Sequence, residues 1–159
     1  MMLLPSVLTI SLCLGISVAQ AQVGDPEVLR PRVPSDQLEA LRTITNPLPA
    51  TPDLVAKGKA LFEGKAFCRA CHGSDGKGLG GDIESGSLKG PLPRNFTDQE
   101  WQAARTDGEL LWILKNGSKG TAMAPFIPLI LTEEEAWQVL LYVRSFGQTR
   151  DKPKAVGQP

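Results

Sequence analysis

The fold and chemistry of this chain are constrained most by five consecutive residues, Cys68-Arg69-Ala70-Cys71-His72. The pattern C-x-x-C-H is the attachment site of a c-type haem. Two residues between the cysteines allow both sulfurs to reach the two vinyl groups of the cofactor from a single helical turn. His72 follows directly, which places its imidazole where it can bind the iron on one face of the ring. The motif therefore predicts one covalently attached haem c.

Candidates for the second axial ligand of the iron are few. The chain has three Cys, one His and three Met. Cys13, Met1 and Met2 lie in an apolar leader, so Met123 is the one methionine expected in the mature chain. Met123 falls on a predicted loop, where a methionine rarely serves only to fill the core. Thioether sulfur is a soft ligand that raises the reduction potential of haem iron, so we expect His72 and Met123 to bind the metal from opposite faces.

Other uses of the motif lack the residues that they need. A structural zinc site takes four Cys or His ligands, and only three such residues lie together here. A thioredoxin-like redox pair would lie within a βαβ pattern, whereas the flanking sequence indicates a helix and a Gly-rich loop. Neither zinc nor thiol–disulfide chemistry is therefore expected.

The N-terminal residues indicate export. Residues 1–22 carry no charged side chain, and the apolar run Leu3–Val18 is followed by Ala19-Gln20-Ala21, an A-x-A cleavage signal. We expect a signal peptide over residues 1–21 and a periplasmic or otherwise exported protein, because haem is attached covalently outside the cytoplasm. A retained membrane anchor stays open, although the run is shorter than the roughly 20 residues of a span. No other transmembrane candidate occurs in the sequence.

The overall charge argues against one class of partner. The 17 basic and 17 acidic side chains give a formal net charge of zero. Nucleic acid would require a basic surface, so we expect none as a partner.

Residues 22–50 are punctuated by prolines and form a predicted arm that precedes the main domain. The arm either lies on the domain or links it to a partner, and a disordered linker is the alternative. Within it, residues 35–42 are predicted to form about two helical turns with Ser35 as N-cap. Residues 148–159 are predicted to form a loose tail.

Helix signals fill the predicted domain, residues 51–147. Thr51-Pro52-Asp53 begins a helix that runs to about Phe62. Gly58 in its middle costs about 1 kcal/mol relative to alanine, which favours close approach of another helix. Three capping boxes of the form T-x-x-E predict three further helices, namely Thr97/Glu100 to about Ala104, Thr106/Glu109 to about Lys115, and Thr132/Glu135 to about Phe146. The last helix is apolar on two faces, so one face should meet the helix of Gly58 and the other the haem region.

The extended segment Gly90–Phe96 offers further groups to the haem. A proline carbonyl here could accept the second ring N–H of His72 and fix its orientation. Arg94 could pair with a haem propionate. A plain surface turn is the alternative for this segment.

The order of these motifs resembles that of class I (monohaem, His/Met) bacterial c-type cytochromes. The resemblance includes Gly58 and Phe62, the C-x-x-C-H motif and a stretch similar to "GEL-W-x-x-KNG-x-x-GT-x-M", here Gly108–Trp112, Lys115–Gly117 and Gly120–Met123. Ala124 departs from the pattern, since many relatives have proline directly after the methionine. The resemblance implies an all-α cytochrome c fold of about four to five helices around one covalently attached haem, with Cys68, Cys71, His72 and Met123 binding it.

The resemblance implies one-electron transfer without substrate chemistry, by a periplasmic carrier or an electron-transfer subunit of a respiratory oxidoreductase. The partners would be redox proteins of unknown identity, and association with a membrane complex stays open. Lysines near the motif could form a docking face for an acidic partner, namely Lys57, Lys59, Lys65, Lys77 and Lys89. A plain solvated surface is the alternative for these lysines. A haem-based binder or sensor of NO or CO with a displaceable methionine is the alternative function. Peroxidase-like catalysis is not expected, because no second histidine is present for proton transfer.

Overall fold

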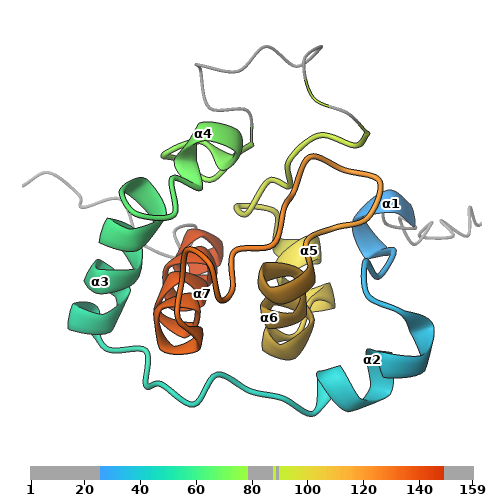
Figure 1. The fold of residues 1–159 in the computed structure, drawn as a ribbon, viewed down its shortest axis with the longest axis horizontal. Coiled ribbons are helices and arrows are strands. Elements are labelled where there is room, and N and C mark those ends of the chain that lie inside the picture. The colour runs from blue at the N-terminus through green and yellow to red at the C-terminus, as the bar shows by residue number, and fades with distance from the viewer. Residues whose placement is uncertain (1–25, 79–87, 89, 149–159) are drawn as a thin grey trace, which may run out of the picture.

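The computed structural model describes residues 26–78, 88 and 90–148. Within these residues all regular structure is helical, in seven helices and no strand, which confirms the predicted all-α class (Figure 1). The helices are α1 (Pro26–Leu29), α2 (Ser35–Arg42), α3 (Pro52–Glu63), α4 (Arg69–His72), α5 (Gln99–Ala104), α6 (Asp107–Asn116) and α7 (Glu133–Gly147). The predicted signal peptide, Lys89 and the tail beyond residue 148 lie outside the described residues. No helix of the described part is both long and apolar enough to cross a membrane.

The helices α3 and α7 pack side by side and form one half of the core (Figure 1). At the crossing, Gly58 is buried, and a Cβ atom there would collide with the carbonyl of Gln138 and lie 3.2 Å from Cβ of Tyr142. One turn later the Phe62 side chain is 1% exposed, and its ring meets that of Tyr142 edge-on at 5.3 Å. The predicted close crossing at Gly58 is confirmed.

Polar caps fix the first turns of the helices around this crossing. Both predicted capping boxes at the starts of α6 and α7 are present, from Thr106 and Thr132 respectively. The predicted cap of α5 is wrong by one residue. The Asn95 side chain accepts the backbone N–H of Thr97 at 2.9 Å and its hydroxyl at 2.8 Å, so Asp98 caps the helix instead. Ser35 also fails as a predicted N-cap, because it lies inside α2, whose N-cap is Pro34.

The α7 helix is buried on two faces, as its pattern predicts. It contributes more buried residues than any other described helix, namely Ala136, Trp137, Gln138, Val139, Leu140, Leu141, Tyr142, Val143 and Phe146. Tyr142 and Phe146 pack towards Phe62 on α3. Val139, Leu140 and Val143 on the same helix line a cavity described below.

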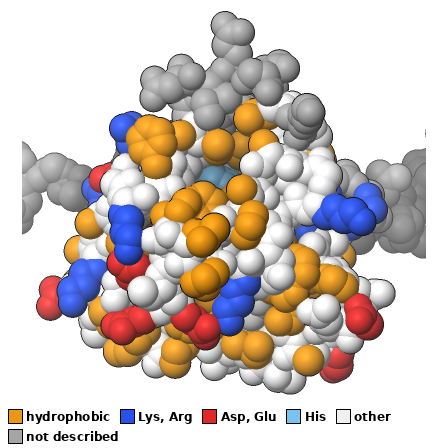
Figure 2. All heavy atoms as spheres, viewed as in Figure 1, with side chains coloured by type: hydrophobic (Ala, Val, Ile, Leu, Met, Phe, Trp, Pro, Cys, Tyr) orange, Lys and Arg blue, Asp and Glu red, His pale blue; other side chains and the backbone are white. Residues whose placement is uncertain are grey.

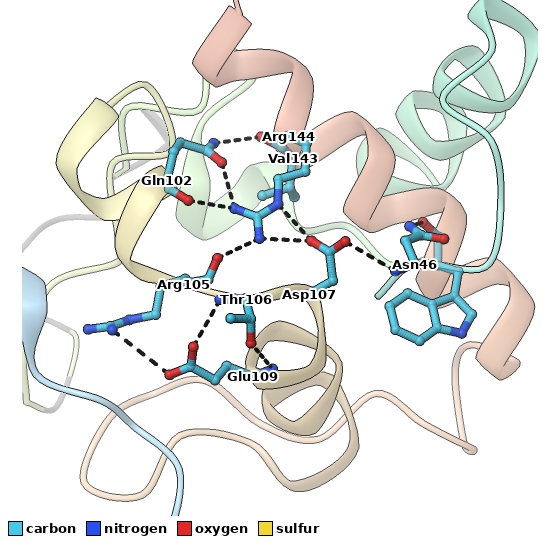
Figure 3. Close-up of polar contacts among 9 residues, drawn as sticks. Asn46, Gln102, Arg105, Thr106, Asp107, Glu109, Val143 and Arg144 are labelled. Carbon is cyan, nitrogen blue, oxygen red and sulfur yellow. Dashed lines mark hydrogen bonds and ion pairs between the residues drawn. The ribbon is translucent and has the colours of Figure 1, made fainter. Parts of the chain in front are cut away.

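An arginine-centred hydrogen-bond network joins α5, α6 and α7 (Figure 3). Arg144 on α7 donates to Oδ1 of Asp107 at 2.8 Å, and to the backbone carbonyls of Gln102 at 2.9 Å and Arg105 at 2.6 Å. Gln102 returns a bond to the carbonyl of Val143 at 3.0 Å. The planar guanidinium donates hydrogen bonds to acceptors on several sides, so it fixes the C-terminal end of α5 against α6 and α7.

The described part of the N-terminal arm lies along α5 and α6 (Figure 1). Asn46 donates from its backbone to Asp107 at 3.2 Å and from its side chain to the carbonyl of Trp137 at 2.9 Å. Gly108 donates to the carbonyl of Ile44 at 3.2 Å, and its lack of a side chain leaves room for the arm's backbone at Leu41. Residues 26–50 are therefore built into the folded structure.

Replacing Gly58 with alanine tests the crossing of α3 and α7. Alanine favours an isolated helix by about 1 kcal/mol, but here the added methyl group meets the backbone of Gln138. Overpacking of this kind typically costs about 1–3 kcal/mol, so Gly58→Ala should lower the free energy of unfolding of the holoprotein measured in urea. Lys57→Ala on the exposed face of α3 is the control and should change it little. A Gly58→Ala protein as stable as the parent would contradict the close crossing.

Candidate haem site

The chain makes a sharp turn between α3 and α4 that presents the cysteine motif. Phe67 has φ of +49°, the left-handed region that a side chain disfavours. The guanidinium of Arg69 lies 4.8 Å from the centroid of its ring, which covers one face of this exposed phenylalanine. Cys68 then forms the N-cap of the single-turn α4, so Cys68 and Cys71 lie on one short helix with free, half-buried thiols. This is the spacing from which one turn can reach two vinyl groups.

The imidazole of His72 is held in one orientation by two contacts. Its Nδ1 lies 3.3 Å from the carbonyl oxygen of Arg94, and because a carbonyl can only accept, Nδ1 carries the proton. Its ring stacks on Phe96 with centroids 4.3 Å apart. From the sequence we expected the carbonyl of a proline as the partner of His72. The partner is indeed a backbone carbonyl of this segment, but it belongs to Arg94.

The electrostatics of His72 suit a metal ligand. Burial lowers the pKa of His72 from 6.5 to about 4, against a smaller opposing effect of the Arg94 carbonyl. The imidazole is therefore neutral at physiological pH, and Nε2 keeps a lone pair for a metal. Burial also raises the pKa of Cys68 to about 12, so its thiol stays protonated. Among the described residues, no group of three or more His, Cys, Asp or Glu side chains could hold a metal by itself.

Met123 lies in the loop between α6 and α7, which tight turns hold in place. Gly117 ends α6 with φ of +73°, and a Cβ atom there would lie 2.7 Å from the carbonyl of Met123. That carbonyl accepts the backbone N–H of Ser118 at 2.9 Å, and the backbone N–H of Met123 donates to the Thr121 hydroxyl at 3.1 Å. These hydrogen bonds hold the loop although Ala124, and not the proline of many similar proteins, follows the methionine.

All four predicted site residues line one cavity of about 240 Å³. Cys71 and His72 come from α4, Cys68 is the N-cap of that helix, and Met123 comes from the loop after α6. The walls are mostly apolar, with contributions from α3, α5, α6 and α7 that include Phe62, Trp101, Leu110, Leu114 and Leu140. Figure 2 shows the single histidine side chain among hydrophobic side chains on this face of the molecule. The described residues thus offer two thiols, an imidazole, a thioether and an apolar slot, which is the set that a covalent haem needs.

The comparison with protein families identifies the cofactor for which these four side chains are suited. The cytochrome c family model matches residues 55–147. The chain belongs to the cytochrome c family. Its cofactor is one covalently attached haem c, and the spacing of Cys68 and Cys71 fits a single attachment site.

Two solved structures are similar to this cytochrome. A chain of the Kuenenia stuttgartiensis reducing HAO-like protein complex Kustc0457/Kustc0458 is 27% identical, with a TM-score of 0.55 over 63% of this chain. The match spans 46% of that chain, so this protein corresponds to less than half of it. The KustC0563 c-type cytochrome is 31% identical over 56% of this chain and 95% of its own, with a TM-score of 0.44. No curated protein matches significantly.

Other residues of the site had not been singled out from the sequence. Phe96, which stacks on His72, had no distinguishing pattern. The cavity also contains three side chains that carry charge besides Arg94, namely Arg32, Arg105 and Glu109. The i, i+4 spacing of Arg105 and Glu109 across the start of α6 is a sequence signal for that pair, whereas no local signal points from Arg32 to the cavity.

Replacing both motif cysteines tests the attachment. In Cys68→Ala/Cys71→Ala, haem should become extractable into acidified acetone, because only non-covalent contacts would hold it. In the parent, and in the control Ser74→Ala just beyond α4, haem should stay with the protein. Covalent haem in the double variant would show that the attachment site lies elsewhere.

Proposed function

We propose that this cytochrome transfers single electrons through its haem, with His72 and Met123 as the two axial ligands and Cys68 and Cys71 as the attachment points. The observation that carries the proposal is the convergence of these four side chains on one mostly apolar cavity, three of them from α4 and its N-cap and one from a separate loop. When bound, the haem supplies an iron that cycles between Fe(III) and Fe(II). With both axial positions filled by protein, no coordination site is left for substrate chemistry.

Residues around the haem limit how far the ligands must move when the iron gains or loses an electron. The Arg94 carbonyl and the Phe96 ring hold the imidazole of His72 in place. Turns at Gly117 and Thr121 hold Met123. The apolar walls exclude water, which would otherwise reorient around the changing charge. The soft thioether favours the reduced state and so raises the potential.

Two described side chains favour docking through an apolar surface at the mouth of the cavity. Phe67 and Leu92 both line the cavity, and each is 51% exposed. Of the two interpretations of the lysines near the motif, a docking face and a solvated surface, the ion pairs favour the solvated surface, because Lys59, Lys65 and Lys77 lie near carboxylates. The pairs are Lys59–Glu63 at 3.9 Å, Lys65–Glu135 at 2.7 Å and Lys77–Asp75 at 3.5 Å. Paired lysines present less net charge to an acidic partner.

We infer that the protein works outside the cytoplasm, either as a periplasmic carrier or as an electron-transfer subunit of a respiratory oxidoreductase. The expected signal peptide supports export, and the likeness to a chain of the Kuenenia complex supports a role beside redox partners. A separate catalytic activity is not proposed. His72 is the one histidine of the chain and is taken up as a ligand, which leaves no imidazole for proton transfer.

Carbon monoxide distinguishes the carrier from a gas-binding protein. The reduced parent should show no change in its visible spectrum within the mixing time of a stopped-flow experiment, because Met123 occupies the sixth position. Met123→Leu removes that ligand at similar volume and should bind CO rapidly, which shows that the assay detects an open site. Rapid CO binding by the parent would favour the gas binder or sensor over the electron carrier.

A further inference from the structure

Two helices of this protein begin with the same kind of capping box, and the two boxes lie in different surroundings. Thr132 and Glu135 open α7, and Thr106 and Glu109 open α6. In each box the glutamate accepts the backbone N–H of the threonine, at 2.8 Å in α7 and at 2.9 Å in α6. The two boxes therefore allow a comparison within one chain, because their residue types and local hydrogen bonds are the same.

The carboxylate of the α7 box is fully paired and reaches solvent. Both oxygens of Glu135 accept hydrogen bonds from Nζ of Lys65 at 2.7 Å, and the Glu135 side chain is 26% exposed. A capping box thus needs no buried charge.

The carboxylate of the α6 box is buried in the wall of the haem cavity. Glu109 is 1% exposed, and it is the one carboxylate among the described residues that line the cavity. Its Oε2 accepts from Thr106, whereas its Oε1 is the one buried side-chain oxygen or nitrogen of the described residues without a hydrogen-bond partner (Figure 3). Burying a carboxylate oxygen in this way costs free energy. The α7 box shows that the cap alone does not require this cost.

The ion-pair partner of Glu109 is Arg105, whose guanidinium donates its hydrogen bonds elsewhere. Its Nη1 lies 3.9 Å from Oε1 of Glu109 and donates to the carbonyl of Ala104 at 3.2 Å. Its Nη2 donates to the carbonyls of Val28 and Arg30. At neutral pH a glutamate beside a guanidinium is a carboxylate, so a negative charge is built into the cavity wall.

We propose that Glu109 sets the reduction potential of this cytochrome, because its buried negative charge stabilises Fe(III) over Fe(II) and lowers the midpoint potential. The inference rests on the function proposed above and adds a residue outside the four that bind the haem. The redox centre is more positive by one unit charge when it is oxidised. A negative charge in a mostly apolar wall acts on that difference with little screening, whereas a charge at the surface is screened by water and salt. Glu109 thus opposes the thioether of Met123, which raises the potential.

Two matched variants test this role in the full-length holoprotein. Glu109→Gln removes the charge but keeps an oxygen that can accept the N–H of Thr106, since glutamine also serves in capping boxes. It should shift the midpoint potential, measured by spectroelectrochemical titration, to a more positive value, and the shift should persist in added salt. Glu135→Gln makes the same change in the α7 box and should give a smaller shift that salt reduces further. Equal shifts in the two variants, or no positive shift in Glu109→Gln, would overturn the proposal.

A third variant separates charge from geometry and also serves if Glu109→Gln fails to hold haem. Glu109→Asp keeps the charge and shortens the side chain by one methylene group, so it should leave the midpoint potential near that of the parent. A positive shift in Glu109→Asp as large as that in Glu109→Gln, or any clear positive shift if the glutamine variant lacks haem, would assign the effect to altered packing and overturn the proposal.

The near-infrared band of the iron–methionine bond distinguishes the possible failures. It should be present in the parent and persist in every variant, because Met123 is unchanged. Loss of the band in Glu109→Gln would trace the shift to the axial ligand and contradict the role of Glu109. Its absence from the parent would count against the proposed function, whereas an unshifted potential with the band present would count against the role of Glu109 alone.

Discussion

The close packing of α3 on α7 determines where everything else in this cytochrome lies. Because Gly58 brings its backbone against Gln138 and Tyr142, α3 ends over the aromatic side chains of α7. The chain then turns at Phe67 and presents α4 to the cavity that Val139 and Leu140 of α7 also line. One helix thus serves as the support of the attachment motif and as a wall of the haem pocket. A side chain at position 58 would clash with the backbone of α7 at Gln138.

The placement of charge follows from the same packing. The cavity is mostly apolar, and its charged side chains come from segments far apart in the sequence. Arg144 holds α5, α6 and α7 together through the backbone carbonyls of Gln102 and Arg105 (Figure 3). Arg105 in turn holds the arm through the backbone carbonyls of Val28 and Arg30. Because these hydrogen bonds go to backbone carbonyls, they depend little on the side chains of the neighbouring residues.

The elements that could be predicted from the sequence are those with a local physical signature. The C-x-x-C-H spacing, the two capping boxes and the mid-helix glycine each specify their structure within a few residues. The predictions that failed or stayed open concern residues with competing hydrogen-bond partners, or with partners far away in the sequence. Thr97 loses its role as cap because its hydroxyl and N–H bond Asn95, which leaves Asp98 free to cap α5. The course of the arm was undecided, because Asn46 and Arg32 find their neighbours only when the chain has folded.

The central claim is that His72 and Met123 hold the iron from opposite faces, and the bond from iron to sulfur tests it most directly. Ferric haem with a methionine ligand has a weak charge-transfer band in the near infrared. The account predicts this band in the oxidised parent and its loss in Met123→Ala, the variant of the one methionine that follows the expected leader. Absence of the band in the parent, or its persistence in the variant, would contradict the account.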